Sequence, residues 1–123
     1  MIIGIGCDII EINRVEKAVQ SDSFKKRVFT EAEIAYCESR GKQQFASFAA
    51  RFAAKEAVLK AFGTGLRGGE LVEIEVLNDE LGCPQLSLRG YHEELAQSKG
   101  VVKIHVTLSH SKDSAMAYVV LEG

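Results

Sequence analysis

The segment from Phe45 to Gly63 constrains the fold more than any other part of the chain. Its sequence, FASFAARFAAKEAVLKAFG, is rich in Ala and contains no Pro, which predicts one long helix. Glu56 is expected in the middle of an apolar stripe on this helix, where a carboxylate is costly unless it is paired or bound to a cation. The stripe consists of four side chains at helical spacing that should face the core: Phe45, Phe48, Phe52 and Leu59.

Length and composition predict one domain over residues 1–123, since 46% of the 123 residues are apolar and only one is Pro. The net charge of −2 argues against a generic nucleic-acid-binding protein. No apolar run is long enough to cross a bilayer, and the N-terminus lacks the basic region of a signal peptide. Three widely spaced cysteines show neither metal-ligand spacing nor a disulfide framework, which favours a reducing, cytoplasmic location.

Helices are expected early in the chain and antiparallel strand pairs late, which makes the fold class α+β. Thr30 followed by Glu33 forms a capping box, and the stretch Ser21-Asp22-Ser23 can cap a short helix with the sequence FKKRVF. Two hairpins are expected, one over residues 71–88 and one over residues 101–121, with a short polar helix at 90–99 between them. In the second hairpin we expect four side chains to face the core: Val102, Ile104, Val106 and Leu108.

Residues Ile2 to Ile10 are expected to form a buried strand. Asp8 lies on the same strand face as Gly4 and Gly6, and these glycines leave room for another element or a ligand to come close. The GIGCDI sequence lacks the third glycine of a dinucleotide-binding fingerprint, so that function is not favoured.

Asp8 and Glu56 are two acids expected to be buried, and Lys60 lies one helical turn beyond Glu56. Two carboxylates that converge beside a lysine suggest a Mg²⁺ ion bound through substrate phosphates. The alternative is structural: Glu56 pairs with Lys60 along the helix, and Asp8 caps the helix that follows its strand. Spacing alone leaves the two interpretations level.

His110 is a second candidate because two hydroxyl residues, Ser109 and Ser111, flank it and Lys112 follows. Such a group in a turn could hold a phosphate. A Ser-His-acid triad is a poorer hypothesis, because the chain contains no nucleophile-elbow pattern.

The segment from Arg14 to Arg27 contains five basic and two acidic residues, a local charge of +3. A solvated helix face is the simpler interpretation of such a cluster. The alternative is a docking surface for an acidic partner, with Phe24 as an apolar anchor. From the residues alone, the chain is therefore interpreted as a small cytosolic enzyme that uses Mg²⁺ and phosphate and carries a basic docking segment.

Three stretches resemble the holo-[acyl-carrier-protein] synthase family, the short bacterial class of the 4′-phosphopantetheinyl transferase superfamily. They are GIGCDIIEINRV at the N-terminus, RFAAKEAVLKAFGTG in the middle and LSHSK near the end. The resemblance spans essentially the whole chain. The family's turn before the second hairpin strand often contains Asn and Lys, whereas this chain has Leu81 and Cys83, and we assign these two residues no binding role.

The resemblance implies transfer of the 4′-phosphopantetheine arm of coenzyme A to a serine of an acidic acyl carrier protein. Asp8 and Glu56 would bind Mg²⁺ on the pyrophosphate, and Lys60 would meet the phosphates and assist the leaving nucleotide. The general base would be Glu56 or a water on the metal. The 3′-phosphate would be held by Arg51 and by the group around His110: Ser109, His110 and Ser111.

For the carrier, the resemblance implies a binding surface on the basic helix around Arg14, which extends our docking hypothesis for Phe24 and Arg27. It also implies a homotrimer with active sites at subunit interfaces, built from one half-unit per chain. Two other functions remain open: a non-catalytic module that binds acidic proteins, and a different Mg²⁺-dependent nucleotide phosphotransferase.

Overall fold

A computed structural model describes all residues 1–123. The early part of the chain is helical after its first strand, and the later part carries the remaining strands, as the α+β prediction requires. The elements, in chain order, are β1 (Ile2–Glu11), α1 (Ile12–Ala18), α2 (Asp22–Val28), α3 (Glu31–Glu38), the 3₁₀ turn η1 (Gly41–Gln43), α4 (Gln44–Phe62), η2 (Leu71–Glu73), β2 (Ile74–Asn78), β3 (Pro84–Leu88), α5 (Gly90–Ser98), β4 (Lys103–His110) and β5 (Ser114–Glu122).

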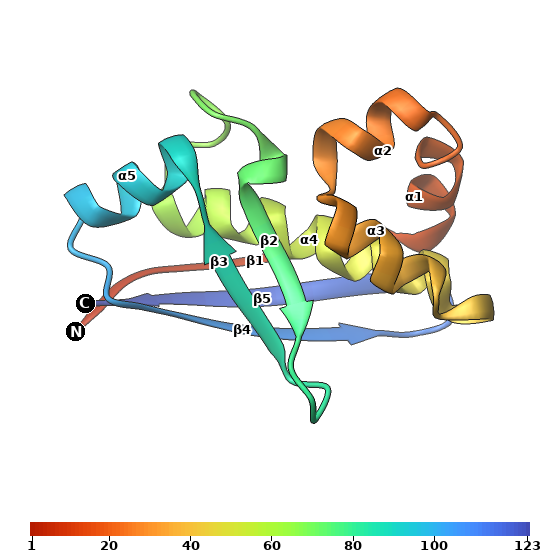
Figure 1. Ribbon diagram of the computed structural model, residues 1–123. Coiled ribbons are helices and arrows are strands. Elements are labelled where there is room, and N and C mark those ends of the chain that lie inside the picture. Colours follow the sequence, from red (N-terminus) through yellow and green to blue (C-terminus); the bar gives the residue numbers. More distant parts are fainter.

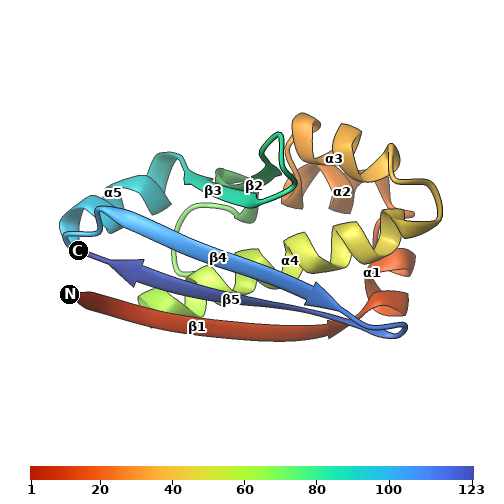
Figure 2. The same ribbon diagram turned by 90° about the horizontal axis from the view of Figure 1, so that it is seen from below.

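The long helix α4 lies across one face of a three-stranded antiparallel sheet with strand order β1-β5-β4 (Figures 1 and 2). The hairpin β2–β3 and helix α5 lie on the other side of α4, beside the helical group α1–α3 (Figure 1). The two termini lie side by side, and the Met1 ammonium group donates a hydrogen bond of 2.6 Å to the Gly123 carbonyl oxygen. No helix is both long enough and apolar enough to cross a membrane.

Strand β1 packs against α4 through two glycines, Gly4 and Gly6. A side chain at either position would collide with the backbone of the helix. A Cβ atom on Gly4 would lie 2.1 Å from the Ala61 carbonyl oxygen, and one on Gly6 would lie 2.0 Å from the Ala57 carbonyl oxygen. The open space expected beside Asp8 is therefore filled by the backbone of the central helix. Ala57 and Ala61 are themselves buried, so the contact is made by small residues on both sides.

The expectation that β1 is buried holds for one face only. Ile5 and Ile9 are 56% and 68% exposed, and Cys7 between them is exposed as well. The reason is that α4 covers one side of the sheet and no other element of the chain covers the opposite side (Figure 2). Val102 is also wrongly predicted: it precedes β4 and is 81% exposed.

Helix α4 is confirmed nearly to the residue, and it ends at Phe62 with Gly63 as its C-cap, where a φ of 78° suits glycine. The predicted stripe is confirmed for Phe48 and Leu59, which are 1% and 4% exposed, but it does not account for the charged residues of the helix. Glu56 is only half-buried, whereas Arg51 and Lys55, which the stripe places outside it, are 2% and 0% exposed. A helix packed by the sheet on one side and by α1, α3 and β2 on the others has no single inward face.

The local signals at helix ends are confirmed. The Ser21 hydroxyl accepts a hydrogen bond from the Phe24 amide, and Thr30 with Glu33 forms the complete capping box. The first hairpin begins three residues late, because residues 71–73 form η2 before β2 starts at Ile74.

Candidate active site

Asp8 and Lys60 form an ion pair where β1 crosses the last turn of α4. The Lys60 ammonium lies 2.9 Å from the Asp8 carboxylate, and the Asp8 side chain is 17% exposed against 56% for Lys60. The hydrogen bond to Asp8 is also the main reason why the pKa of Lys60 is raised. Lys60 therefore stays a cation whose charge lies at the edge of the site, in contact with solvent.

Glu56 lies one helical turn before Lys60 and shares this site. The pKa of Glu56 is raised, first by burial and second by the nearby Asp8 carboxylate, while Lys60 opposes the rise. The structural alternative from the sequence is not observed, since the Lys60 ammonium pairs with Asp8 and not with Glu56. Asp8 does not cap the next helix either, because the N-cap residue of α1 is Glu11.

The two carboxylates are a plausible partial ligand set for a hard divalent cation. No third Asp, Glu, His or Cys joins them in a cluster that could hold a metal on its own. Mg²⁺ commonly binds through one or two carboxylates, substrate phosphates and water, so the residues fit this ion once a phosphorylated substrate is present. A cation would also offset the repulsion between the half-buried Glu56 carboxylate and the nearby Asp8 carboxylate.

Arg51 projects from α4 toward β2, away from Glu56. Arg51 and Glu56 are five positions apart, so their side chains point about 140° apart around the helix axis. The Arg51 Nε group donates to the Val76 carbonyl at 3.1 Å, Nη2 donates to the Asn78 side-chain oxygen at 2.7 Å, and Nη1 donates to the Ser47 hydroxyl at 3.0 Å. Arg51 is thus a buried, well-bonded side chain.

Arg51 and His110 line one pocket, of about 290 Å³. This volume is at the lower end for small-molecule sites, so the pocket would hold one part of a larger ligand. Ser109 lines the same pocket, whereas Ser111 lies with His110 and Lys112 on a neighbouring one. The expected cradle is not a single turn, because His110 is the last residue of β4 and the Ser111 hydroxyl accepts from the Ser114 amide.

Two of the five basic residues in the segment from Arg14 to Arg27 form ion pairs with carboxylates of this chain. Lys25 pairs with Glu38 and Lys26 pairs with Asp22, each at about 3 Å. The three predicted partner-binding residues differ in exposure. Arg14 and Arg27 are exposed, whereas Phe24 is half-buried with its ring 6.2 Å from that of Phe52.

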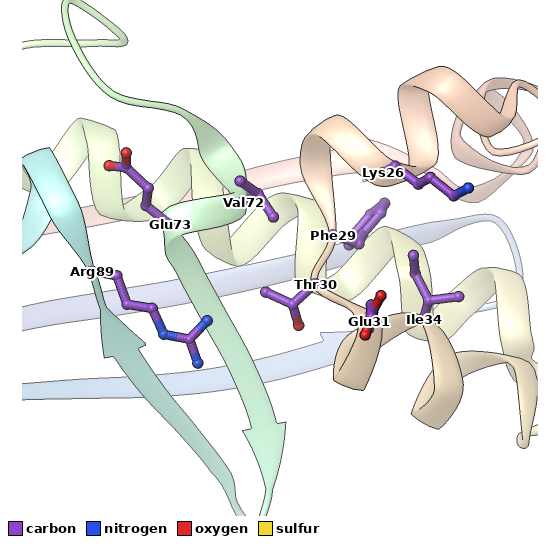
Figure 3. Close-up of a pocket in the computed structure, with 8 residues that line it drawn as sticks. All are labelled: Lys26, Phe29, Thr30, Glu31, Ile34, Val72, Glu73 and Arg89. Carbon is purple, nitrogen blue, oxygen red and sulfur yellow. The ribbon is translucent and has the colours of Figure 1, made fainter.

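A larger pocket lies elsewhere and contains none of the predicted catalytic or coenzyme-binding residues. It has a volume of about 410 Å³ and lies between the α2–α3 corner and the β2–β3 hairpin (Figure 3). Phe29, Ile34 and Val72 supply its apolar surface, and Lys26 and Arg89 are charged groups at its border. Both of those cations already have carboxylate partners, Asp22 and Glu75 respectively, so we assign the pocket no role.

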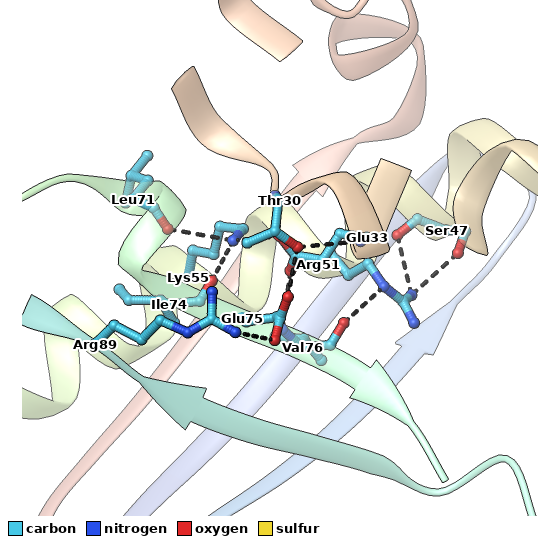
Figure 4. A network of polar contacts seen from close by, with 10 residues as sticks. All are labelled: Thr30, Glu33, Ser47, Arg51, Lys55, Leu71, Ile74, Glu75, Val76 and Arg89. Atoms are coloured by element: carbon cyan, nitrogen blue, oxygen red, sulfur yellow. Dashed lines mark hydrogen bonds and ion pairs between the residues drawn. The ribbon is translucent and has the colours of Figure 1, made fainter. Parts of the chain in front are cut away.

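Sequence reasoning missed the most buried charged pair of the chain. The Lys55 ammonium lies 2.9 Å from the Glu33 carboxylate, and both side chains are fully buried (Figure 4). Lys55 also donates to the carbonyl groups of Leu71 and Ile74, and Glu33 accepts from the Val76 amide at 2.9 Å. Burial lowers the pKa of Lys55, and the Glu33 charge opposes this shift. The capping box indicated Glu33, but nothing in the pattern indicated its partner.

Comparison with known proteins agrees with this geometry. A family model described as the 4′-phosphopantetheinyl transferase superfamily matches residues 4–119. A holo-[acyl-carrier-protein] synthase of Clostridium tetani is 49% identical, over 100% of this chain and 98% of its own. The crystal structure of the Neisseria meningitidis holo-[acyl-carrier-protein] synthase superimposes with a TM-score of 0.90 at 32% identity, covering 100% of both chains.

A third relative carries a ligand. The Bacillus anthracis holo-(acyl-carrier-protein) synthase, solved in complex with CoA (3′,5′-ADP), matches with a TM-score of 0.80 at 42% identity, over 98% of this chain and 96% of its own. The chain belongs to the 4′-phosphopantetheinyl transferase superfamily and, within it, to the holo-[acyl-carrier-protein] synthase family.

The buried Glu33–Lys55 pair leads to a stability prediction. The Lys55→Met substitution leaves the Glu33 carboxylate buried without its cation, which should lower the free energy of unfolding by about 3–5 kcal/mol. The double variant Glu33→Gln with Lys55→Met should regain part of this loss, because neither charge remains. Recovery is incomplete because the introduced amide nitrogen must face one of the two backbone amides that donate to Glu33, those of Thr30 and Val76. Urea denaturation measures both values.

Lys26→Met is the matched control, since the Lys26–Asp22 pair is more than 70% exposed on both sides. Its effect should stay within about 1 kcal/mol. A Lys55→Met loss as small as that of Lys26→Met would show that the buried pair is not needed for stability.

Proposed function

We propose that this chain transfers the 4′-phosphopantetheine arm of coenzyme A to a serine hydroxyl of an apo-acyl carrier protein. The serine oxygen forms a bond to the β-phosphorus, the bond between this phosphorus and the bridging oxygen breaks, and adenosine 3′,5′-bisphosphate leaves. The observation that carries the proposal is the group of Asp8, Glu56 and Lys60, placed on a fold that matches holo-[acyl-carrier-protein] synthases over its full length.

Asp8 and Glu56 would hold a Mg²⁺ ion against the pyrophosphate. When bound, the ion supplies positive charge where negative charge builds up during phosphoryl transfer. Lys60 adds a second positive charge on the exposed side of the site, where it can move from Asp8 to the phosphates of the leaving nucleotide. The serine proton goes to a base, either Glu56 or water.

Arg51 and the residues around His110 would hold the adenosine end, with Arg51 meeting the 3′-phosphate. Their pocket is separate from the Asp8–Glu56 site within one chain, because Arg51 bonds to β2 whereas Glu56 lies beside β1. The two half-sites therefore fit one coenzyme molecule best when they come from two subunits.

A homotrimer would bring such half-sites together, and the number three rests on the resemblance to the family. The uncovered face of the sheet supports self-association. Ile5, Ile9 and Tyr118 are between 41% and 68% exposed there, and β1 pairs Cys7 with Tyr118 and Ile9 with Met116 across it. Contiguous apolar surface of this kind commonly marks an interface. We further propose that residues 1–123 act as one domain in the cytoplasm and supply holo-carrier for fatty acid biosynthesis.

The transfer itself is tested by incubating the protein with apo-carrier, coenzyme A and Mg²⁺ and measuring the mass of the carrier. Wild-type protein should add the mass of the phosphopantetheine arm. Glu56→Gln should abolish the addition because it removes a charged metal ligand, while its circular dichroism spectrum stays that of the wild type. Near-normal turnover by Glu56→Gln would contradict the metal-ligand role. No mass gain with wild-type protein would favour a non-catalytic module, and modification of another acceptor would favour a different phosphotransferase.

Carrier docking on the basic segment is tested by Arg14→Glu. This exposed residue should meet an acidic carrier, so charge reversal should raise the KM for carrier by about fivefold and leave the KM for coenzyme A unchanged. Lys99→Glu, an equal change of charge at the far end of the molecule beside α5, is the control and should alter neither value. Equal rises in both KM values would argue against a docking surface.

Sharing of the active site between subunits is tested by mixing two impaired variants. Glu56→Gln disables one half-site and His110→Ala weakens the other. In a ring of subunits, each shared site takes Glu56 from one subunit and His110 from its neighbour. Random mixing of the two variants therefore gives about a quarter of the sites both intact residues. The co-expressed mixture, assayed at low coenzyme A, should therefore exceed the summed rates of the separate variants. A rate at or below that sum would place the whole site in one chain.

A further inference from the structure

Asn78 holds the buried guanidinium of Arg51 more tightly than any other side chain does. The distance from Arg51 Nη2 to the Asn78 side-chain oxygen is 2.7 Å, the shortest of the hydrogen bonds that Arg51 makes. The Val76 carbonyl accepts from Nε and the Ser47 hydroxyl accepts from Nη1. Asn78 is therefore the partner of the third guanidinium nitrogen, Nη2. Both residues line the pocket that also contains Ser109 and His110.

The orientation of the Asn78 amide is itself determined by its neighbours. Its nitrogen donates to the Tyr36 hydroxyl and to the Gly82 carbonyl oxygen, each at 3.1 Å. A flipped amide would turn its nitrogen toward the Arg51 guanidinium, where two donors would face each other. The oxygen must therefore point at Arg51.

The Tyr36 ring holds the same guanidinium from a second direction. The Arg51 Cζ atom lies 4.4 Å from the ring centroid, within the range of a cation–π contact. The guanidinium is thus held at its edges by hydrogen bonds and at one face by an aromatic ring. Nη2 carries two N–H groups, and the contact with Asn78 engages one of them.

We infer that Asn78 is a positioning residue, which orients Arg51 so that its free Nη2 hydrogen meets the 3′-phosphate of the coenzyme. This inference rests on the proposed function, in which Arg51 binds that phosphate. A guanidinium held before the ligand arrives loses less conformational entropy on binding than one on a free side chain. Asn78 would therefore help the enzyme to select coenzyme A over 3′-dephospho-coenzyme A.

The 3′-phosphate is remote from the bond that breaks, so its contacts should act equally on the bound substrate and on the transition state. Loss of such an interaction raises KM and leaves kcat unchanged. A general loosening of the fold would instead lower the active fraction for both coenzymes alike. The ratio of kcat/KM for coenzyme A to that for 3′-dephospho-coenzyme A is independent of the active fraction.

The experiment measures this ratio for wild-type protein and for three variants: Arg51→Met, Asn78→Ala and Asp79→Ala. A hydrogen bond to a charged group is worth enough to give the wild type a preference of at least about tenfold for coenzyme A. Arg51→Met should remove the preference, and Asn78→Ala should reduce it by at least about fivefold through the KM for coenzyme A. Asp79→Ala is the matched control.

Asp79 is a suitable control because it supports the same hairpin turn. Its carboxylate accepts from the Leu81 and Cys83 amides, each at 2.9 Å, and it makes no hydrogen bond to Arg51. Asp79→Ala should keep the wild-type ratio. If it lowers the ratio as much as Asn78→Ala does, the effect comes from the hairpin and the inference is overturned.

Failure of the inference and failure of the proposed function give different results. A lost preference in Arg51→Met together with a full preference in Asn78→Ala overturns the positioning role and leaves the proposed function in place. A wild-type ratio near one, or no effect of Arg51→Met, removes the phosphate-binding role of Arg51 and the inference with it. Absence of any transfer with either coenzyme rejects the proposed function itself.

Discussion

The ion pair between Glu33 and Lys55 connects the three parts of the structure that hold the site. The Glu33 carboxylate joins the start of α3 to β2 through the Thr30 and Val76 amides, and Lys55 brings α4 to the same point. Burying two charges costs several kcal/mol for each, so the pair is retained only because its hydrogen bonds are satisfied on both sides. With Lys55 bonded to Glu33 and to the carbonyl groups of Leu71 and Ile74, this side of α4 is turned toward α3 and β2, which defines the rotation of the helix about its own axis.

That rotation explains why the two proposed half-sites lie on different sides of one helix. Arg51 precedes Lys55 by four residues and so faces β2 with it, where Val76 and Asn78 bind the guanidinium. Glu56 and Lys60 are also four residues apart and face β1, where Asp8 lies. Helical periodicity thus sends Arg51 toward β2, and Glu56 and Lys60 toward β1. This divergence is why we propose that a single coenzyme molecule contacts one group on each of two subunits.

The sequence predicted those features that depend on local chemistry. The capping box at Thr30, the extent of α4 and the order of the strands followed from residue types and spacing. The family motif indicated candidate site residues, whose roles stay predictions. The burial of individual side chains around α4 could not be predicted, because an amphipathic pattern assumes that the helix has one inward face. This helix is packed on several sides. Gly6 signalled a close approach but not its occupant. The contact of Asn78 with Arg51 had no signal at all, since the two residues lie 27 positions apart in the chain.

The small residues between β1 and α4 set the geometry of the carboxylate pair. Gly4 and Gly6 allow the helix backbone to approach the strand so closely that a methyl group at Gly6 would overlap the Ala57 carbonyl oxygen. Asp8 is two residues beyond Gly6 on the same face, and Glu56 is next to Ala57. Any separation of strand and helix would therefore move the two carboxylates apart by a similar distance. Mg²⁺ tolerates little variation in its ligand distances, so under the proposed function the glycines would serve the metal site as well as the packing.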